Sequence, residues 1–116
     1  MNPHDYCQDK AAKSGSSFYY SFMFLPAERR QAITALYAFC REVDDVVDEC
    51  HDLSLAQTKL EWWRQEVGRV YNGTPTHPVG LALKDVIKGF RLPQEQLLEI
   101  IDGMAMDLSQ TRYLDF

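Results

Sequence analysis

Several features are missing from this sequence, and each absence narrows the class of protein. No stretch of about 18 apolar residues occurs among the 116, so we expect no transmembrane helix. The N-terminal stretch Met1–Lys13 is polar and has no apolar core, so we expect no secretory signal peptide. Basic residues form no tract interleaved with aromatic ones, and the net charge is -5, which argues against a nucleic-acid partner. These absences together predict a cytoplasmic protein.

Cysteine is scarce and unpatterned. The three cysteines, Cys7, Cys40 and Cys50, form no CxxC pair, and their number is odd. Without an export signal, free thiols in a reducing compartment are expected, and we expect Cys40 to be a small core residue. No histidine pattern accompanies them, so nothing indicates a cysteine nucleophile. His4, His51 and His77 show no ligand spacing and are expected at the surface.

Strand signals are also absent, whereas helix signals recur along the chain. We expect an all-α fold in which short connections pack the helices antiparallel as one bundle, a single helical domain over residues 1–116. Asn2 and Pro3 begin the first predicted helix, and a capping box of Ser54 and Gln57 begins the third. The predicted helices span residues 2–15, 26–50, 54–73, 78–89 and 93–109. The aromatic stretch 16–25 is expected to form a short buried helix or turn.

The helix over residues 26–50 carries three kinds of side chain on three sectors. The apolar sector is predicted to hold Ile33, Leu36, Cys40, Val43 and Val47. The solvated sector is predicted to hold Glu28, Gln31, Glu42 and Glu49. Between them lies a polar stripe, defined by spacings of four, three and four residues: Tyr37, Arg41, Asp44 and Asp48. Of the paired tryptophans, we expect one of Trp62 and Trp63 in the core and one partly exposed, and we expect Met104 and Met106 to be ordinary packing residues.

The polar stripe breaks two local rules of helix formation. Asp44, Asp45 and Asp48 crowd like charges into one turn, which destabilises a helix, and they lie near its C-terminus, where acidic groups oppose the helix dipole. Such conflicts mark functional sites, and a divalent cation would remove this one, because carboxylates one turn apart suit Mg²⁺. Arg41 would then hold a phosphate or neutralise an aspartate. Spacing alone leaves open a second interpretation, in which these acids pair with Arg41 or face water.

The wider sequence resembles the squalene/phytoene synthase family, and within it the bacterial presqualene diphosphate synthase branch. The resemblance covers essentially the whole chain and rests on these runs: Ser14–Tyr19, Leu25–Pro26, Arg29–Arg30, Leu36–Glu49, Trp62–Arg64, Gly103–Leu108 and Arg112–Tyr113. It implies an isoprenoid-synthase fold with a central cavity. It also implies an enzyme that condenses two farnesyl diphosphates head to head into presqualene diphosphate, through magnesium-assisted loss of diphosphate, attack on the allylic cation and closure of a cyclopropane.

The resemblance also implies roles for individual residues. Asp44 and Asp48 match the first aspartate-rich motif as Mg²⁺ ligands, with Asp45 between them as a further candidate, and Tyr37 and Arg41 would contact the diphosphate. The positions that match the substrate cavity are Ser16, Ser17, Phe18 and Asp107. NADPH would be needed only if a full-length parent reduced its product to squalene.

The resemblance has one serious gap. Family members are more than twice as long and carry a second aspartate-rich motif, which would lie beyond Phe116. We therefore expect a fragment that is inactive by itself and that associates with itself through bare apolar faces. A peripheral membrane contact of the full-length parent stays open. Three further hypotheses for the function also stay open: phytoene synthesis from geranylgeranyl diphosphate, a non-catalytic helical module that binds magnesium and diphosphate, and a structural bundle whose acids bind a basic partner.

Overall fold

The computed structural model describes residues 2–13, 24–49 and 52–114, with side chains described as far as Met106. Within these ranges the chain forms five helices: α1 (Pro3–Lys13), α3 (Ala27–Glu49), α4 (Leu53–Asn72), α5 (Pro78–Phe90) and α6 (Gln94–Leu114). The all-α prediction is confirmed, and the predicted starts of the helices lie within one residue of the observed ones. The last helix runs five residues further than expected, because no glycine or proline between Ser109 and Leu114 breaks it.

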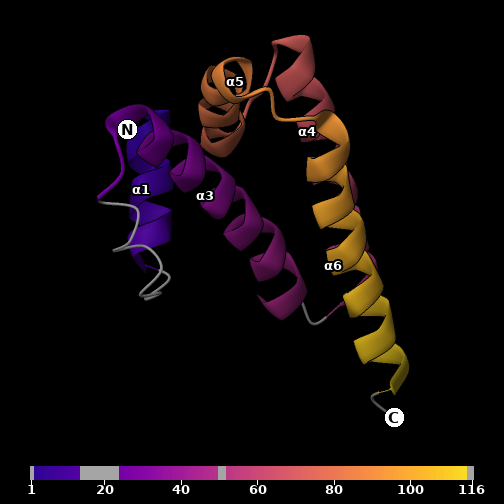
Figure 1. Ribbon diagram of the computed structural model, residues 1–116. Helices are drawn as coiled ribbons and strands as arrows, with labels where there is room; N and C mark the ends of the chain where they lie inside the picture. The colour runs from indigo at the N-terminus through magenta and orange to yellow at the C-terminus, as the bar shows by residue number, and fades with distance from the viewer. Residues whose placement is uncertain (1, 14–23, 50–51, 115–116) are drawn as a thin grey trace.

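The helices form a bundle of two diverging pairs joined by α5 (Figure 1). α1 lies along α3, and α6 returns antiparallel to α4. α5 packs against α1, α3 and α4 and lies at the end of the molecule where the two pairs are spread apart (Figure 1). Towards the other end α3 approaches α4 and α6, and only residues 50–52 separate the end of α3 from the start of α4 (Figure 1). In the described residues no helix is long and apolar enough to cross a membrane.

Side chains cap the N-termini of α1 and α4, and a glycine ends α4. One of the caps predicted from the sequence is wrong. The Asn2 carboxamide accepts from the backbone N–H of His4 (2.8 Å), which confirms its capping role. The α4 cap is Asp52, whose carboxylate accepts from the backbone of Ser54 (2.8 Å) and Leu55 (3.3 Å). The predicted capping box of Ser54 and Gln57 is therefore wrong, because the helix starts one residue earlier and Ser54 already lies in its first turn. Gly73, at φ 87°, ends α4 in the left-handed conformation that glycine adopts without strain.

The core lies where α1, α3, α4 and α5 meet and is lined on one side by α6. Its largest fully buried apolar side chains are Phe39, Leu60, Leu83, Leu97 and Ile101. Each such side chain contributes roughly 2–3 kcal/mol by leaving water. Trp63 is buried at 5% exposure and meets Phe39 edge to face, whereas Trp62 is 38% exposed, which confirms the expectation of one core and one partly exposed tryptophan.

The face by which α3 packs differs from the predicted one. The residues buried on it are Thr34, Ala35, Ala38, Phe39, Val43 and Val46. Of the predicted apolar sector only Val43 is fully buried, and Ile33 is 38% exposed. Ala35 and Ala38 let the neighbouring helices approach closely, so the face that carries them together with Phe39 packs on the core, and the face that carries Ile33 does not. Glu42, predicted to be solvated, is half-buried, and Glu28, Gln31 and Glu49 are exposed as expected.

A buried carboxylate holds the connection between α4 and α5. Glu66 is 1% exposed, yet it accepts from the backbone N–H groups of Thr76 (3.0 Å) and His77 (2.8 Å) and from Arg69 Nε (2.8 Å). These donors satisfy a charge whose burial alone would be costly. Gly80 makes room for it, because a Cβ there would overlap Glu66 Oε2. The loop is thereby fixed against α4.

Three further expectations can be compared with the structure. His77 is not a surface residue: it caps α5, where its Nδ1 accepts from Val79 N (3.1 Å), and its ring packs on Tyr6 and Trp63. Cys7 is a buried free thiol, and Cys40 is a half-buried one that packs on the core. Met104 packs against the core, but Met106 is 61% exposed.

The aromatic segment can be compared only in part. Residues 16–23, together with Cys50 and His51, lie outside the described residues. Phe24 is described and is 90% exposed, so the expected burial is wrong at that position.

Candidate functional site

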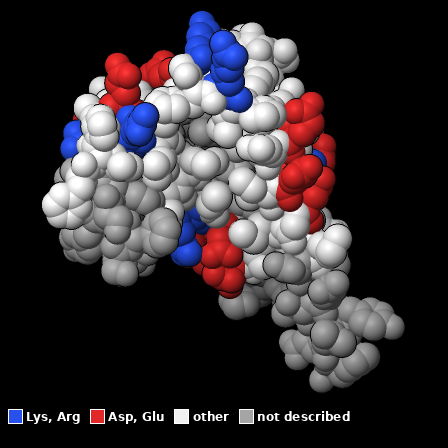
Figure 2. All heavy atoms as spheres, viewed as in Figure 1, with Lys and Arg blue, Asp and Glu red and all other residues white. Residues whose placement is uncertain are grey.

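The polar stripe lies on the C-terminal half of α3, on the side turned away from the buried face, and Arg41 is its centre. The guanidinium donates from Nη1 to Asp44 Oδ2 (2.9 Å) and from Nη2 to Asp45 Oδ1 (3.0 Å). Figure 2 shows basic and acidic groups meeting over this half of α3, apart from a second acidic group over α6. A planar guanidinium that spans two carboxylates is held in one orientation.

Asp44 and Asp48 share one side of the helix. At about 100° per residue they lie about 40° apart, one turn from each other, and away from the buried face. Burial and then the charge of Asp48 raise the pKa of Asp44 above its ordinary value, although Arg41 opposes the shift. Two carboxylates that repel each other in this way are the arrangement that a hard divalent cation stabilises.

Asp45 faces a different neighbour. It lies about 100° around the helix from Asp44, towards α1, where Lys10 Nζ donates to its Oδ2 (2.5 Å). Lys10 also lies 3.7 Å from Glu42. Desolvation lowers the pKa of Lys10, but the hydrogen bond to Asp45 and the charge of Glu42 outweigh it, so that the pKa is raised and Lys10 stays charged. Asp45 thus has two cationic partners and a position apart from the other two aspartates.

Next to this pair, Tyr6 connects α1 to α3. Its hydroxyl donates to Glu42 Oε1 (2.7 Å), and burial followed by this contact raises the pKa of the phenol. Burial and the charge of Glu42 also raise the pKa of the Cys7 thiol to about 12. Cys7 therefore stays protonated at neutral pH, the form in which a thiol is a poor nucleophile.

Of the other predicted site residues, the structure describes some and not others. Tyr37 is half-buried one turn before Arg41 and so continues the stripe. Ser16, Ser17 and Phe18 lie outside the described residues. Asp107 lies in α6, and its side chain is outside the described part of that helix. The described structure therefore brings together Tyr37, Arg41, Asp44 and Asp48, and it turns Asp45 towards α1.

The donor set of the stripe fits one wall of a magnesium site. Asp44 and Asp48 supply carboxylate oxygens, which Mg²⁺ prefers, and both are open enough to leave room for water and phosphate oxygens. Among the described residues, no three His, Cys, Asp or Glu side chains are arranged to hold one ion.

An apolar groove lies beside the stripe towards the N-terminal end of α3. It has a volume of about 440 Å³ and runs between α3 and the end of α5. Its lining residues are Arg29, Ala32, Ile33, Leu36, Val86, Phe90 and Leu92. Ile33 lies one turn before Tyr37, so the groove and the stripe occupy adjacent sectors of one helix. The volume is in the range of small-molecule sites.

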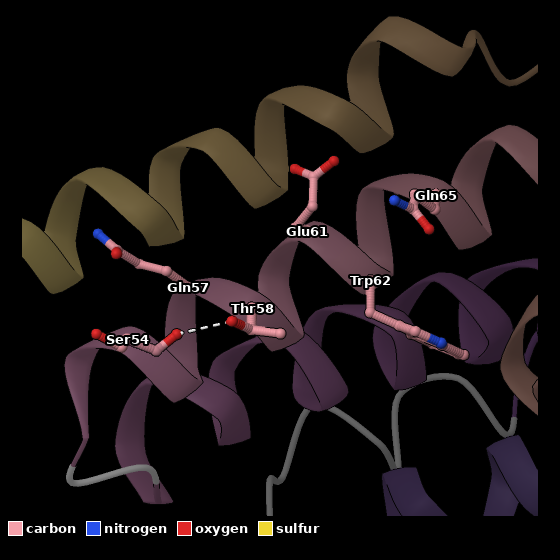
Figure 3. A pocket seen from close by; sticks show the side chains of 6 residues that line it. All are labelled: Ser54, Gln57, Thr58, Glu61, Trp62 and Gln65. Carbon is pink, nitrogen blue, oxygen red and sulfur yellow. Dashed lines mark hydrogen bonds between the residues drawn. The ribbon is translucent and has the colours of Figure 1, made fainter.

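Two other hollows have polar linings. The hollow in Figure 3 is lined by α4 alone: Ser54, Gln57, Thr58, Glu61, Trp62 and Gln65. Glu61 points towards α6 and Trp62 away from it, so these polar groups do not converge on one point (Figure 3). The second hollow, of about 470 Å³, lies beside Lys10, Asp45 and Trp62, where oppositely charged groups already pair with each other.

Comparison with known proteins decides the family. The sequence profile described as squalene/phytoene synthase matches residues 11–116. The chain belongs to the squalene/phytoene synthase family. Similar relatives of this family include a presqualene diphosphate synthase from Zymomonas mobilis, 41% identical over 98 residues (84% of this chain, 33% of the relative). A phytoene synthase from Arthrospira platensis is 33% identical over 113 residues, which are 97% of this chain and 37% of the relative.

This squalene/phytoene synthase family chain spans about a third of the length of the curated relatives it matches. The chloroplastic phytoene synthase of Cucumis melo, for example, is 31% identical over 97% of this chain but only 27% of its own length. No solved structure matches the chain. The family membership confirms the resemblance found in the sequence, including the all-α isoprenoid-synthase fold to which this bundle belongs.

Sequence reasoning missed the contacts that reach α3 from α1. Tyr6 and Lys10 are one turn apart, so both face α3, and Glu42 and Asp45 are three residues apart on the side of α3 that receives them. That spacing was a readable signal, but it points to a partner only once the two helices are known to pack. The Glu66 network had no comparable signal, because its donors are backbone groups of a loop.

Proposed function

We propose that this chain is the part of a head-to-head prenyltransferase that binds the diphosphate of a prenyl substrate. Asp44 and Asp48 hold Mg²⁺, Arg41 and Tyr37 contact the diphosphate, and the groove beside Ile33 receives the start of the prenyl chain. The observation that carries the proposal is the polar stripe itself: two carboxylates and an arginine on one helix face, pointing away from the core. The family membership of the chain supports it.

The chemistry of the departing group explains the residue types. When bound, Mg²⁺ neutralises the negative charge that develops on the leaving diphosphate. Arg41 can add a bidentate contact to phosphate oxygens, because its guanidinium matches their geometry. A Mg²⁺ ion held by Asp44 would compete with Arg41 for that carboxylate, and the guanidinium of Arg41 would then be available to phosphate oxygens.

The apolar groove supports the second half of the reaction. An allylic carbocation reacts with any nearby water, so it survives only where water is excluded. Leu36, Val86 and Phe90 offer such a wall a short way along α3 from the stripe. We infer that the first carbons of the prenyl chain lie against this wall while the diphosphate stays at the polar end.

Farnesyl diphosphate, with presqualene diphosphate as product, is the substrate we favour. The support is the 41% identity with the presqualene diphosphate synthase of Zymomonas mobilis, against 33% for the phytoene synthase of Arthrospira platensis. Geranylgeranyl diphosphate is the alternative, since phytoene synthases match a larger share of this chain. A non-catalytic module that binds magnesium and diphosphate is a second alternative.

Thermal protection of the purified chain tests the binding proposal. We expect Mg²⁺ with farnesyl diphosphate to raise the melting temperature, and Mg²⁺ alone or the diphosphate with a chelator to raise it far less, because the ligand binds only the folded state. Absence of any shift with both together contradicts the proposal and leaves a structural bundle. Product analysis of a longer protein that contains this segment, supplied with farnesyl or geranylgeranyl diphosphate, then separates an enzyme from a binding module and identifies the substrate.

A further inference from the structure

The contact between α1 and the stripe suggests a role that the aspartate-rich motif does not explain. Lys10 is separated by 35 positions from Asp45, yet its ammonium makes the shortest contact of the charged cluster on α3, 2.5 Å to Asp45 Oδ2. The other oxygen of the same carboxylate accepts from Arg41 Nη2 at 3.0 Å. One carboxylate thus stands between two cations, one on each helix.

We propose that Lys10 is a positioning residue for Arg41, which it acts on through Asp45, and that Asp45 is the middle of this bridge and not a magnesium ligand. The inference rests on the proposed function, because it assigns Arg41 to the diphosphate. It extends that function by placing a residue of α1 in control of the arginine.

The geometry separates Asp45 from the cation. Asp44 and Asp48 point to one side of α3, and Asp45 lies about 100° around the helix, on the side that packs on α1. Its side chain is 20% exposed, less than the 31% of Asp44. Both of its oxygens are already engaged by charged donors. A metal at Asp44 and Asp48 would therefore leave the bridge intact.

Charge balance explains why a lysine is needed. Without Lys10, no α1 cation would offset the negative charge of Asp45. That charge would lie beside a second carboxylate, Glu42, whose described neighbour on α1 would then be the neutral hydroxyl of Tyr6. Arg41 would then be drawn more strongly to Asp45 and would be less available to phosphate oxygens. With Lys10 in place, Asp45 orients the guanidinium without holding it completely.

This balance predicts opposite effects on two ligands. In Lys10→Met, the part of the Asp45 charge that Lys10 no longer offsets strengthens binding of Mg²⁺ alone by about threefold, the size expected of one partly exposed charge. The same variant weakens binding of inorganic pyrophosphate at saturating Mg²⁺ by about tenfold, because Arg41 is withdrawn and an anion meets more negative charge. Adding Asp45→Asn to Lys10→Met removes the excess charge and restores the metal affinity of the wild type.

The experiment uses calorimetric titration of the 116-residue chain with Mg²⁺ and then pyrophosphate, in the wild type, Lys10→Met, Asp44→Asn, Asp45→Asn and the double variant of Lys10→Met with Asp45→Asn. Lys13→Met is the matched control, because Lys13 lies on the same helix and pairs with Asp9 at the surface. A general loss of structure would weaken both ligands together and would not be rescued by a second substitution. Parallel weakening of both ligands, or Asp45→Asn losing Mg²⁺ as strongly as Asp44→Asn, would overturn the inference.

A ligand-free measurement keeps this test separate from the proposed function. In ¹⁵N-labelled chain, the guanidinium signals of Arg41 should show slowed rotation that Lys10→Met and Asp45→Asn change and Lys13→Met leaves alone. If the Arg41 signals are the same in Lys10→Met and Asp45→Asn as in the wild type, the bridge is refuted regardless of the results of the ligand titrations. If they respond but the wild type binds no magnesium pyrophosphate, the bridge stands and the proposed function of the chain fails.

Discussion

Asp44 and Asp45 are neighbours in sequence, and both accept from the guanidinium of Arg41, but their carboxylates face in different directions. The guanidinium reaches Asp44 Oδ2 at 2.9 Å and Asp45 Oδ1 at 3.0 Å, and beyond it the two carboxylates diverge, one towards open space and one towards α1. The adjacent acids of the motif therefore have different surroundings, and different surroundings give carboxylates different tasks. We expect the two aspartates to respond differently to a cation.

Metal binding should depend on pH through Asp44. Burial and the charge of Asp48 raise the pKa of Asp44, so a proton competes with a cation there at higher pH than at an ordinary carboxyl group. We expect the affinity for Mg²⁺ to fall as the pH is lowered from about 7 to about 5, before ordinary aspartates titrate. Calorimetric titration at several pH values measures it, and a flat profile over this window would exclude Asp44 as a ligand.

Protonation of His77 should destabilise the fold. Burial lowers the pKa of His77 in the folded chain, although the charges of Glu42 and Glu66 oppose the shift. The unfolded chain therefore binds the proton more tightly, so stability is fully present above the unfolded pKa of about 6.5 and is lost as the pH falls through it. His77→Asn keeps a capping oxygen for α5 and should flatten the dependence of the urea midpoint on pH between about 7 and about 5. If the urea midpoint of His77→Asn depends on pH as steeply as that of the wild type, His77 is not the cause of the pH dependence.

Gly80 should not tolerate a methyl group. A Cβ at Gly80 would overlap the Glu66 carboxylate and lie 3.0 Å from Pro75 Cβ, and Glu66 cannot retreat without losing its backbone donors. We expect Gly80→Ala to lower the free energy of unfolding by about 2 kcal/mol. Gly68→Ala is the control, because a Cβ there meets nothing within 4 Å, and it should stabilise α4 by roughly 0.5–1 kcal/mol. Equal effects at the two sites would contradict the Glu66 arrangement.

The start of α4 offers a direct comparison of two caps. Asp52 accepts from two backbone N–H groups, whereas Ser54 lies inside the first turn of the helix. Asp52→Ala should cost about 1 kcal/mol, and Ser54→Ala much less. Chemical denaturation of the two variants measures the difference. The reverse order would restore the capping box that the sequence predicts.

Local signals in the sequence predicted the helices well, because their ends are set by nearby residues. Asn2, Gly73 and Pro78 act within a few positions of themselves, and each lies where the pattern placed it. The error at Asp52 has the same origin, since two residues of a type that caps helices lie two positions apart there.

The buried face of α3 was harder to predict, because hydrophobicity alone does not choose it. Ile33 is larger than Ala35, but α1 and α5 approach the side where small residues allow it. The same packing brings Lys10 to Asp45, a contact between residues that no helical spacing relates. The polar stripe was recognisable because all its members lie on one helix, and what it faces beyond the described residues is not encoded in that helix.

The central claim, a magnesium site at Asp44 and Asp48, can be tested with two acids in the same turn. Asp48→Asn and Glu49→Gln each remove one charge at the end of α3, but Asp48 lies in the stripe, whereas Glu49 lines the mixed-charge hollow beside Lys10 and Lys59. Calorimetric titration with Mg²⁺ and pyrophosphate should show affinity reduced more than about tenfold in Asp48→Asn and by about threefold or less in Glu49→Gln. Equal losses in the two variants would mean that the stripe attracts cations only by its net charge and would contradict a magnesium site at Asp44 and Asp48.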